Sequence, residues 1–271
     1  MSMKLHFREY GSYRDEHPTL IFLHGLFGAS SNWHSIARKL EMRFHILVPD
    51  LRNHGSSPHA QSMDYPAMGD DLAEFIEEHG LDSALLVGHS MGGKVAMWLA
   101  LSRPALVSAL VVVDIAPVNY PNRFAAIFAA LNRIDLQKLE GREQADRILA
   151  EEIGEFGLRQ FLLQNLQWHD GHWRWRTNLP VLQREMPGIT TFPLPSAGGL
   201  YPGPVLFIHG GASDYMLPEY RPHTLALFPK ARLRTIPGAG HWVYAEQPEP
   251  FFNVLNSFLQ QHHAQGSGFA V

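Results

Sequence analysis

The segment best suited to chemistry is Gly-His-Ser-Met-Gly at positions 88–92, in which two glycines flank a serine. The apolar run at 84–87 predicts a buried strand before it. The apolar spacing over 93–101 predicts a helix after it, which Pro104 ends. A strand, a sharp turn and a helix in this order form a nucleophile elbow, which presents a serine hydroxyl above a sheet. We therefore predict that Ser90 is the nucleophile of an acyl-transfer site.

A serine hydroxyl becomes a good nucleophile only when a base removes its proton, so the site requires a histidine. The chain has 16 histidines. His241 stands apart because it lies in the glycine-flanked segment Gly-Ala-Gly-His-Trp at 238–242, between the last predicted strand and the last predicted helix. A histidine that follows the serine and the acid in the chain is the order typical of such a site. His241 is therefore the predicted base.

Two aspartates could orient this histidine. Asp114 follows the predicted strand at 107–113, and Asp214 closes the segment Gly-Ala-Ser-Asp that follows the predicted strand at 205–209. Because the carboxyl ends of parallel strands meet at one edge of a sheet, either carboxylate could accept the imidazole proton. The position that the acid usually takes in the chain favours Asp214. The residues around the two aspartates do not exclude either of them.

A second loop supplies candidates for binding a negatively charged oxygen. His-Gly-Leu-Phe-Gly at 24–28 follows the second predicted strand, and its Leu26 amide could pair with the Met91 amide as an oxyanion hole. Met91 also begins a predicted helix, whose N-terminus favours negative charge.

Two other polar segments are interpreted differently. Asp-Leu-Arg-Asn-His-Gly-Ser at 50–56 is predicted to be a structural turn whose polar groups serve the loop itself. His169 and His172 are too isolated to predict a metal site, and no His-Glu-x-x-His motif occurs. The sequence predicts neither a metal nor a cofactor.

Strand-like and helical segments alternate through most of the chain, which predicts an α/β fold with a mostly parallel sheet covered by helices on both faces. The remaining predicted strands lie at 5–10, 19–23, 44–48 and 232–236, and the remaining helices at 31–40, 65–79, 219–228 and 250–260.

The alternation stops between 118 and 200. This segment predicts three amphipathic helices at 123–133, 142–153 and 157–167, then a short hairpin at 168–175 and a loop at 192–204. We predict an inserted helical cap at 118–200 on a core formed by 1–117 and 201–271. Its aromatic and apolar residues could line an acyl pocket, although sealing the cap onto the sheet is the favoured role for each of them. They are Phe124, Phe128, Phe161, Leu162, Trp168, Trp173 and Trp175. The tail at 265–271 is predicted to be a frayed end.

Composition narrows the function classes. The chain has 271 residues, of which 45% are hydrophobic and 18% charged, a formal net charge of −4 and no cysteine. These values are ordinary for a globular enzyme, give no support to a nucleic-acid partner, and exclude disulfides and thiolate chemistry. No apolar leader or run of membrane-spanning length occurs, so a cytoplasmic protein without stable membrane insertion is expected. Nothing in the sequence selects an oligomeric state.

Taken together, the motifs resemble the α/β-hydrolase superfamily over essentially the whole chain, and in particular the YbfF-type bacterial esterases and the related mitochondrial abhydrolases. The matching segments are 24–28, 50–55, 63–68, 88–94, Asp-Ile-Ala-Pro-Val at 114–118 and Gly-Ala-Gly-His-Trp-Val at 238–243. The resemblance implies an α/β-hydrolase fold and carboxylesterase or thioesterase activity without a cofactor. By position, it makes Ser90 the nucleophile, His241 the base and Asp114 the acid in preference to Asp214.

The resulting hypothesis is a serine hydrolase that cleaves small-molecule acyl esters, with thioesters as a second substrate class, through an acyl-enzyme intermediate. A carbon–carbon bond hydrolase, a perhydrolase or a lyase would use the same three residues. A ligand-binding receptor that retains them is a hypothesis of a different class.

Overall fold

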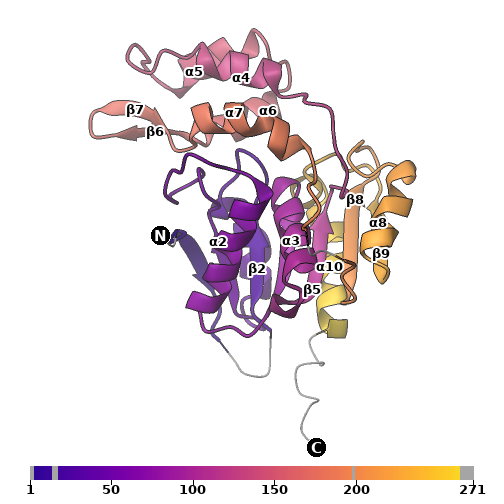
Figure 1. Ribbon diagram of the computed structural model, residues 1–271. Coiled ribbons are helices and arrows are strands. Elements are labelled where there is room, and N and C mark those ends of the chain that lie inside the picture. Colours follow the sequence, from indigo (N-terminus) through magenta and orange to yellow (C-terminus); the bar gives the residue numbers. More distant parts are fainter. Residues whose placement is uncertain (1–2, 14–17, 197–198, 263–271) are drawn as a thin grey trace, which may run out of the picture.

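The computed structural model describes residues 3–13, 18–196 and 199–262 (Figure 1). The predicted frayed end at 265–271 lies outside these residues. A seven-stranded sheet runs through the centre in the order β1-β3-β2-β4-β5-β8-β9. Only the pairing of β1 with β3 is antiparallel, and all the other pairs are parallel. The strands are β1 Phe7–Tyr10, β2 Leu20–Leu23, β3 Ile46–Pro49, β4 Ala84–His89, β5 Val107–Val113, β8 Val205–Gly210 and β9 Ala231–Ile236.

Helices cover both faces of this sheet because the strands bury side chains on both. Along β4, Leu86 packs into one hydrophobic core and its neighbours Leu85 and Val87 into the other. Helices α2 (Tyr65–Glu78) and α3 (Met91–Ser102) close the first core, whereas α1 (His34–Leu40) and α10 (Pro248–His262) close the second. The shorter elements are α8 Arg221–Leu227, α9 Val243–Glu246, and the 3₁₀ turns η1 Ser30–Trp33, η2 Pro104–Leu106 and η3 Pro218–Tyr220. The predicted fold class is therefore confirmed.

Local signals explain where these elements begin. Asp64 caps α2 by accepting a hydrogen bond from the Ala67 amide at 2.8 Å, and a proline occupies the first turn. Several predicted boundaries were wrong by a few residues. The strand expected at 44–48 runs from Ile46 to Pro49, and the helix expected at 93–101 already begins at Met91, directly after the serine.

The segment between β5 and β8 forms a separate layer above the sheet (Figure 1). It contains α4 Ala125–Asn132, α5 Arg142–Ala150, α6 Phe156–Leu163, β6 Leu166–His169, β7 His172–Trp175 and α7 Leu179–Thr190. Strands β6 and β7 form the antiparallel hairpin that the sequence favoured, and Asp170 and Gly171 adopt the positive φ angles of its tight turn.

Helix α7 was missed in the sequence analysis, and the helix expected at 157–167 ends at Leu163 because Leu166 begins a strand. No element was predicted for this region, which contains Pro180 in the first helical turn, where a proline costs no hydrogen bond, and Pro187 inside the helix. The apolar spacing of Leu179, Leu182, Met186 and Ile189, all buried, was the available signal.

No helix within the described residues combines the length and the apolar character needed to cross a membrane.

Candidate active site

Ser90 lies at the turn between β4 and α3, in the strained conformation expected of a nucleophile elbow. Its φ and ψ angles are 53° and −119°, and its amide donates to the Val113 carbonyl at 2.9 Å. A Cβ atom at Gly88 would stand 2.4 Å from the Gly92 carbonyl oxygen, and one at Gly92 would stand 2.5 Å from the His24 carbonyl oxygen. Both glycines are therefore required by close backbone contacts.

The structure brings three of the sequence-predicted residues together. The His241 Nε2 atom lies 3.1 Å from the Ser90 hydroxyl oxygen, and Nδ1 of the same ring lies 2.7 Å from Oδ2 of Asp114. Asp114 is 1% exposed, and its carboxylate also accepts hydrogen bonds from the Gly210 amide and the Ser213 hydroxyl. The Gly210 amide, the Ser213 hydroxyl and the His241 ring thus surround the buried carboxylate with three hydrogen-bond partners, which compensate for its burial.

The structure places Asp214 elsewhere. Its carboxylate accepts a hydrogen bond from the Arg123 guanidinium, and both side chains are more than half exposed. The hydrogen bond from the His241 ring goes to Asp114 instead, although Asp214 lines the cavity beside Ser90.

Two aromatic side chains to which no role was predicted hold the His241 ring and its loop. The Tyr215 ring stacks on the imidazole with a centroid distance of 4.0 Å, and the His89 Nε2–H donates to the His241 carbonyl at 2.9 Å. Burial lowers the pKa of His89 well below its usual value, so this ring is neutral. The only sequence signal for His89 was its place between Gly88 and Ser90 in the Gly-x-Ser-x-Gly motif. No motif pointed to Tyr215.

Leu26, in the loop at 24–28, lines the same cavity as Ser90 and Met91, the first residue of α3. None of the described residues accepts a hydrogen bond from the Leu26 or the Met91 amide, which for Met91 is usual at a helix N-terminus. Phe27 has a positive φ of 60°, and its amide donates to His54 Nε2 at 3.1 Å while its carbonyl accepts from Asn165. These bonds fix the backbone that carries Leu26.

The turn at 50–56 has the structural role that we predicted from the sequence. Asp50 accepts hydrogen bonds from the Ser30 and Ser56 amides, and Arg52 forms a buried ion pair with Asp71 on α2 at 2.6 Å. Burial lowers the pKa of His54 to about 3, which keeps its Nε2 free to accept from Phe27.

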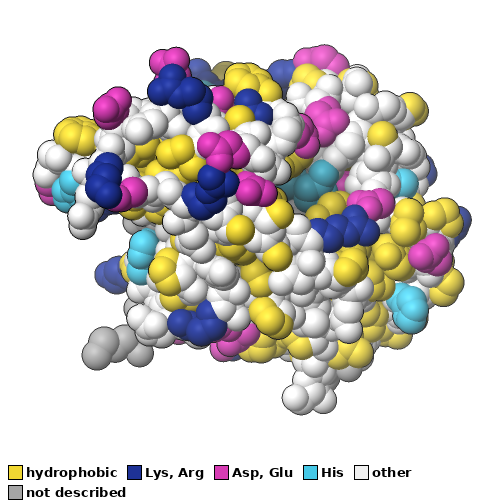
Figure 2. All heavy atoms as spheres, turned by 90° about the horizontal axis from the view of Figure 1, so that it is seen from above, with side chains coloured by type: hydrophobic (Ala, Val, Ile, Leu, Met, Phe, Trp, Pro, Cys, Tyr) yellow, Lys and Arg dark blue, Asp and Glu magenta, His cyan; other side chains and the backbone are white. Residues whose placement is uncertain are grey.

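Ser90 is shared by two cavities. The first, which we call the inner cavity because it reaches from Ser90 to the buried side chains of Lys94 and Tyr65, has about 480 Å³ of empty space, including space open to solvent. The second, which we call the outer cavity, has about 770 Å³ of empty space, again including space open to solvent, and is lined by His241 and Trp242 on the core side. Viewed from above, a histidine side chain lies at the bottom of a hollow whose rim carries acidic and basic side chains (Figure 2).

Of the seven cap residues that the sequence analysis named for an acyl pocket, Phe124 and Phe161 line these cavities, and Phe128 instead packs on Phe27 with a centroid distance of 5.4 Å. The hairpin tryptophans line neither of them, and Trp168 is 56% exposed. Most of the predicted pocket aromatics therefore serve packing. Across the described ranges, no group of three or more histidine or acidic side chains could hold a metal ion.

The sheet order, the elbow and the hydrogen bonds at Ser90 define a class of protein. The family model of the alpha/beta hydrolase fold matches residues 18–248, so the chain belongs to the α/β-hydrolase family. The resemblance predicted from the motifs is thereby confirmed.

Comparison with individual relatives shows which members of this family the chain resembles. The chain is 42% identical over 250 residues to the sn-1-specific diacylglycerol lipase ABHD11 of Mus musculus, covering 89% of this chain and 81% of that protein. It is 39% identical over 259 residues to the esterase YbfF of Escherichia coli, covering 95% and 99%. The solved structure of a marine microorganism esterase matches with a TM-score of 0.91 and 39% identity, covering 95% of this chain and all of that one. Like these relatives, the protein is a hydrolase.

Proposed function

We propose that the protein is a carboxylesterase in which Ser90, His241 and Asp114 form a catalytic triad. The observation that carries the proposal is the continuous hydrogen-bond path from the Ser90 hydroxyl through both ring nitrogens of His241 to the Asp114 carboxylate, with distances of 3.1 and 2.7 Å. These are the lengths at which a proton can pass from a hydroxyl to a base.

In the first step, the Ser90 oxygen attacks the acyl carbon and its proton passes to His241 Nε2. The Leu26 and Met91 amides donate to the oxygen that becomes negative, and Asp114 stabilises the imidazolium. The bond between the acyl carbon and the leaving oxygen then breaks, and Nε2–H protonates that oxygen. The acyl group remains as an ester of Ser90. Water, deprotonated by His241, attacks this ester and releases the acid and the free serine.

The two cavities suggest where each half of the substrate binds. The outer cavity is lined by His241, which must protonate the leaving group, so we assign it to the alcohol or thiol. The inner cavity has both oxyanion candidates in its wall but not His241, and we assign it to the acyl group. The predicted cap at 118–200 supplies walls to both cavities. Phe124, which lines both, lies just before α4.

The proposal is tested with p-nitrophenyl esters of two to sixteen carbons and matching acyl thioesters of coenzyme A. We expect the wild-type protein to hydrolyse esters and the Ser90→Ala variant to be inactive. A phosphonate ester that labels serine nucleophiles should add one equivalent to the wild type and none to Ser90→Ala. Equal hydrolysis by both proteins would refute the proposed nucleophile.

A further inference from the structure

Lys94 is a buried cation that the proposed reaction does not use. It is 2% exposed, lies on α3 one turn after Met91, and lines the inner cavity. In the sequence it is the last residue of the motif at 88–94.

The Lys94 ammonium group binds both chain connections of the cap. Its three hydrogens match three carbonyl oxygens, that of Val118 at 3.0 Å, Thr190 at 3.0 Å and Thr191 at 2.8 Å. Val118 lies where the chain leaves the core, and Thr190 and Thr191 lie where it returns. Because an ammonium group has three donors, none remains for a substrate.

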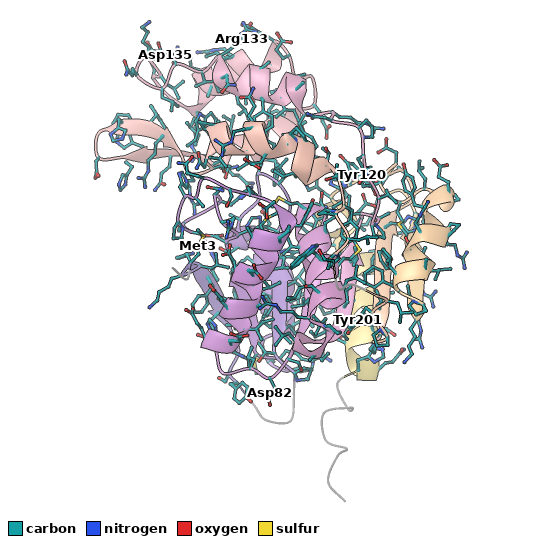
Figure 3. The ribbon with its side chains drawn as sticks, viewed as in Figure 1. Met3, Asp82, Tyr120, Arg133, Asp135 and Tyr201 are labelled. Carbon is teal, nitrogen blue, oxygen red and sulfur yellow. The ribbon has the colours of Figure 1, made fainter. Side chains whose placement is uncertain are left out.

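The two connections also bind each other at this point. The Tyr120 amide donates to the Thr190 carbonyl at 2.9 Å, and the Phe192 amide donates to Asn119 Oδ1 at 2.8 Å. Tyr120 lies where the layer above the sheet meets the core (Figure 3). We call residues 118–120 and 190–192 the cap junction. Through its ammonium group, Lys94 joins this junction to the helix that begins with Met91.

The surroundings of Lys94 suit a cation although they contain no carboxylate partner for it among the described residues. The ammonium lies over the ring faces of Tyr120 at 4.8 Å and Tyr65 at 5.8 Å, and the C-terminal end of α7 presents carbonyls with partial negative charge. Burial nevertheless lowers the pKa of Lys94 to about 7. Desolvating a charge is costly, and methionine would fill a similar unbranched space without that cost. Packing alone therefore does not explain a lysine here.

The cap junction also forms part of the wall of the inner cavity, through Tyr120 and Thr190. We propose that Lys94 is a positioning residue that fixes both connections of the cap to α3 and thereby sets the shape of the inner cavity. The consequence for acyl selectivity rests on the proposed function, because it assumes that this cavity receives the acyl group.

The first experiment compares the wild type with Lys94→Met by amide hydrogen exchange. We expect amide exchange at 116–122 and 188–194 to become faster by about tenfold or more. The variant lacks the three hydrogen bonds from the Lys94 ammonium, so the junction should open locally more often. The matched control is Lys138→Met, which removes an exposed lysine of the cap. Exchange at both segments as slow as in the wild type would overturn the proposal, even if activity fell.

The second readout is the ratio of kcat/KM between short and long p-nitrophenyl esters. Lys94→Met should change this ratio by about tenfold, which is the effect expected when a hydrogen bond to a charged group is lost. Lys138→Met should leave the ratio unchanged. Faster exchange with an unchanged ratio would overturn the link to the inner cavity. A wild type without ester hydrolysis would refute the proposed function, while the exchange result would still decide whether Lys94 holds the junction.

A rescue experiment separates the charge from the space that the side chain fills. The chain has no cysteine, so Lys94→Cys offers 2-bromoethylamine a single thiol, and alkylation in denaturant restores an ammonium at nearly the length of lysine. After refolding, the alkylated protein should recover slow exchange at both segments, whereas the unmodified variant should not. If neither Lys94→Met nor unmodified Lys94→Cys folds, a folded alkylated protein supports the proposal and an unfolded one contradicts it.

Discussion

The imidazole Nδ1 of His241 lies 2.7 Å from Oδ2 of Asp114, across 127 positions of sequence. This contact exists because β5 and β8 are neighbours in the sheet, so that the residue after β5 lies beside the loops that follow β8 and β9. Asp114 itself adopts a positive φ of 53°, and the Gly210 amide at the end of β8 donates to its carboxylate at 2.9 Å. The carboxylate is thus held in place from two strands.

Replacing each aspartate by asparagine should distinguish the two candidate acids. We expect Asp114→Asn to lower kcat by about 10⁴-fold, because an amide donor favours the wrong imidazole tautomer. Asp214→Asn should retain kcat within about threefold, since an exposed ion pair contributes little. The measurement is steady-state hydrolysis of p-nitrophenyl butyrate. A large loss in Asp214→Asn alone would reverse the assignment.

Of the substitutions considered, removal of the Ser90 hydroxyl should lower kcat the most. We expect Ser90→Ala to lower kcat by about 10⁶-fold while the protein stays folded, because the members of a triad act as a unit. Single-turnover assays at high enzyme concentration would detect residual activity. Circular dichroism and the melting temperature serve as folding controls, and a variant that kept a tenth of the wild-type rate would exclude Ser90 as the nucleophile.

His54 should influence the reaction without touching the substrate. In His54→Leu the Phe27 amide loses its acceptor inside the protein, so the backbone carrying the Leu26 amide should shift. We expect kcat to fall by about 10- to 100-fold, with less change in KM, as when an oxyanion donor is misplaced. His59→Leu, which changes an exposed histidine of the same region, is the control. Equal losses in both variants would point to a general effect on stability.

Gly88 should not tolerate a side chain. Gly88→Ala places a Cβ atom 2.4 Å from the Gly92 carbonyl oxygen, and we expect it to lower the free energy of unfolding by about 3 kcal/mol or to prevent folding. Gly188→Ala makes the same chemical change within α7, where nothing lies within 4 Å of the added atom. That variant should gain about 0.5–1 kcal/mol because alanine favours helix. Urea denaturation measures both values.

Mild acid should destabilise the fold through buried neutral histidines. Burial lowers the pKa of His24, His54 and His89 in the folded protein, so between pH 6.5 and 5 the unfolded chain binds more protons than the folded one. The stability is fully present above pH 6.5. As the pH falls, the free energy of unfolding should decrease by up to about 1.4 kcal/mol per pH unit for each histidine. Denaturation by urea at several pH values measures this slope, and His54→Leu should reduce it. An identical slope in that variant would contradict the role of His54.

Much of this protein could be predicted from short stretches of sequence. Gly88 and Gly92 are explained by contacts within the elbow and with the end of the neighbouring strand β2. The run of apolar residues in β4 explains why its side chains are buried on both faces of the sheet. Helix α7 shows where such reasoning failed. No helix was predicted there, although the buried face formed by Leu182 and Met186 stabilises one despite Pro187 in its interior.

The sequence by itself determined the class of fold and the positions of Ser90 and His241, because strand, turn and helix signals act over a few residues. The residue types and spacing left Asp114 and Asp214 both open, and the resemblance favoured Asp114. The tertiary structure shows the imidazole bonded to Asp114, Asp214 paired with Arg123, and Lys94 bonded to both connections of the cap. These partners lie far apart in the chain. The order of the strands and the path of the inserted segment bring them together, and local spacing contains no information on either.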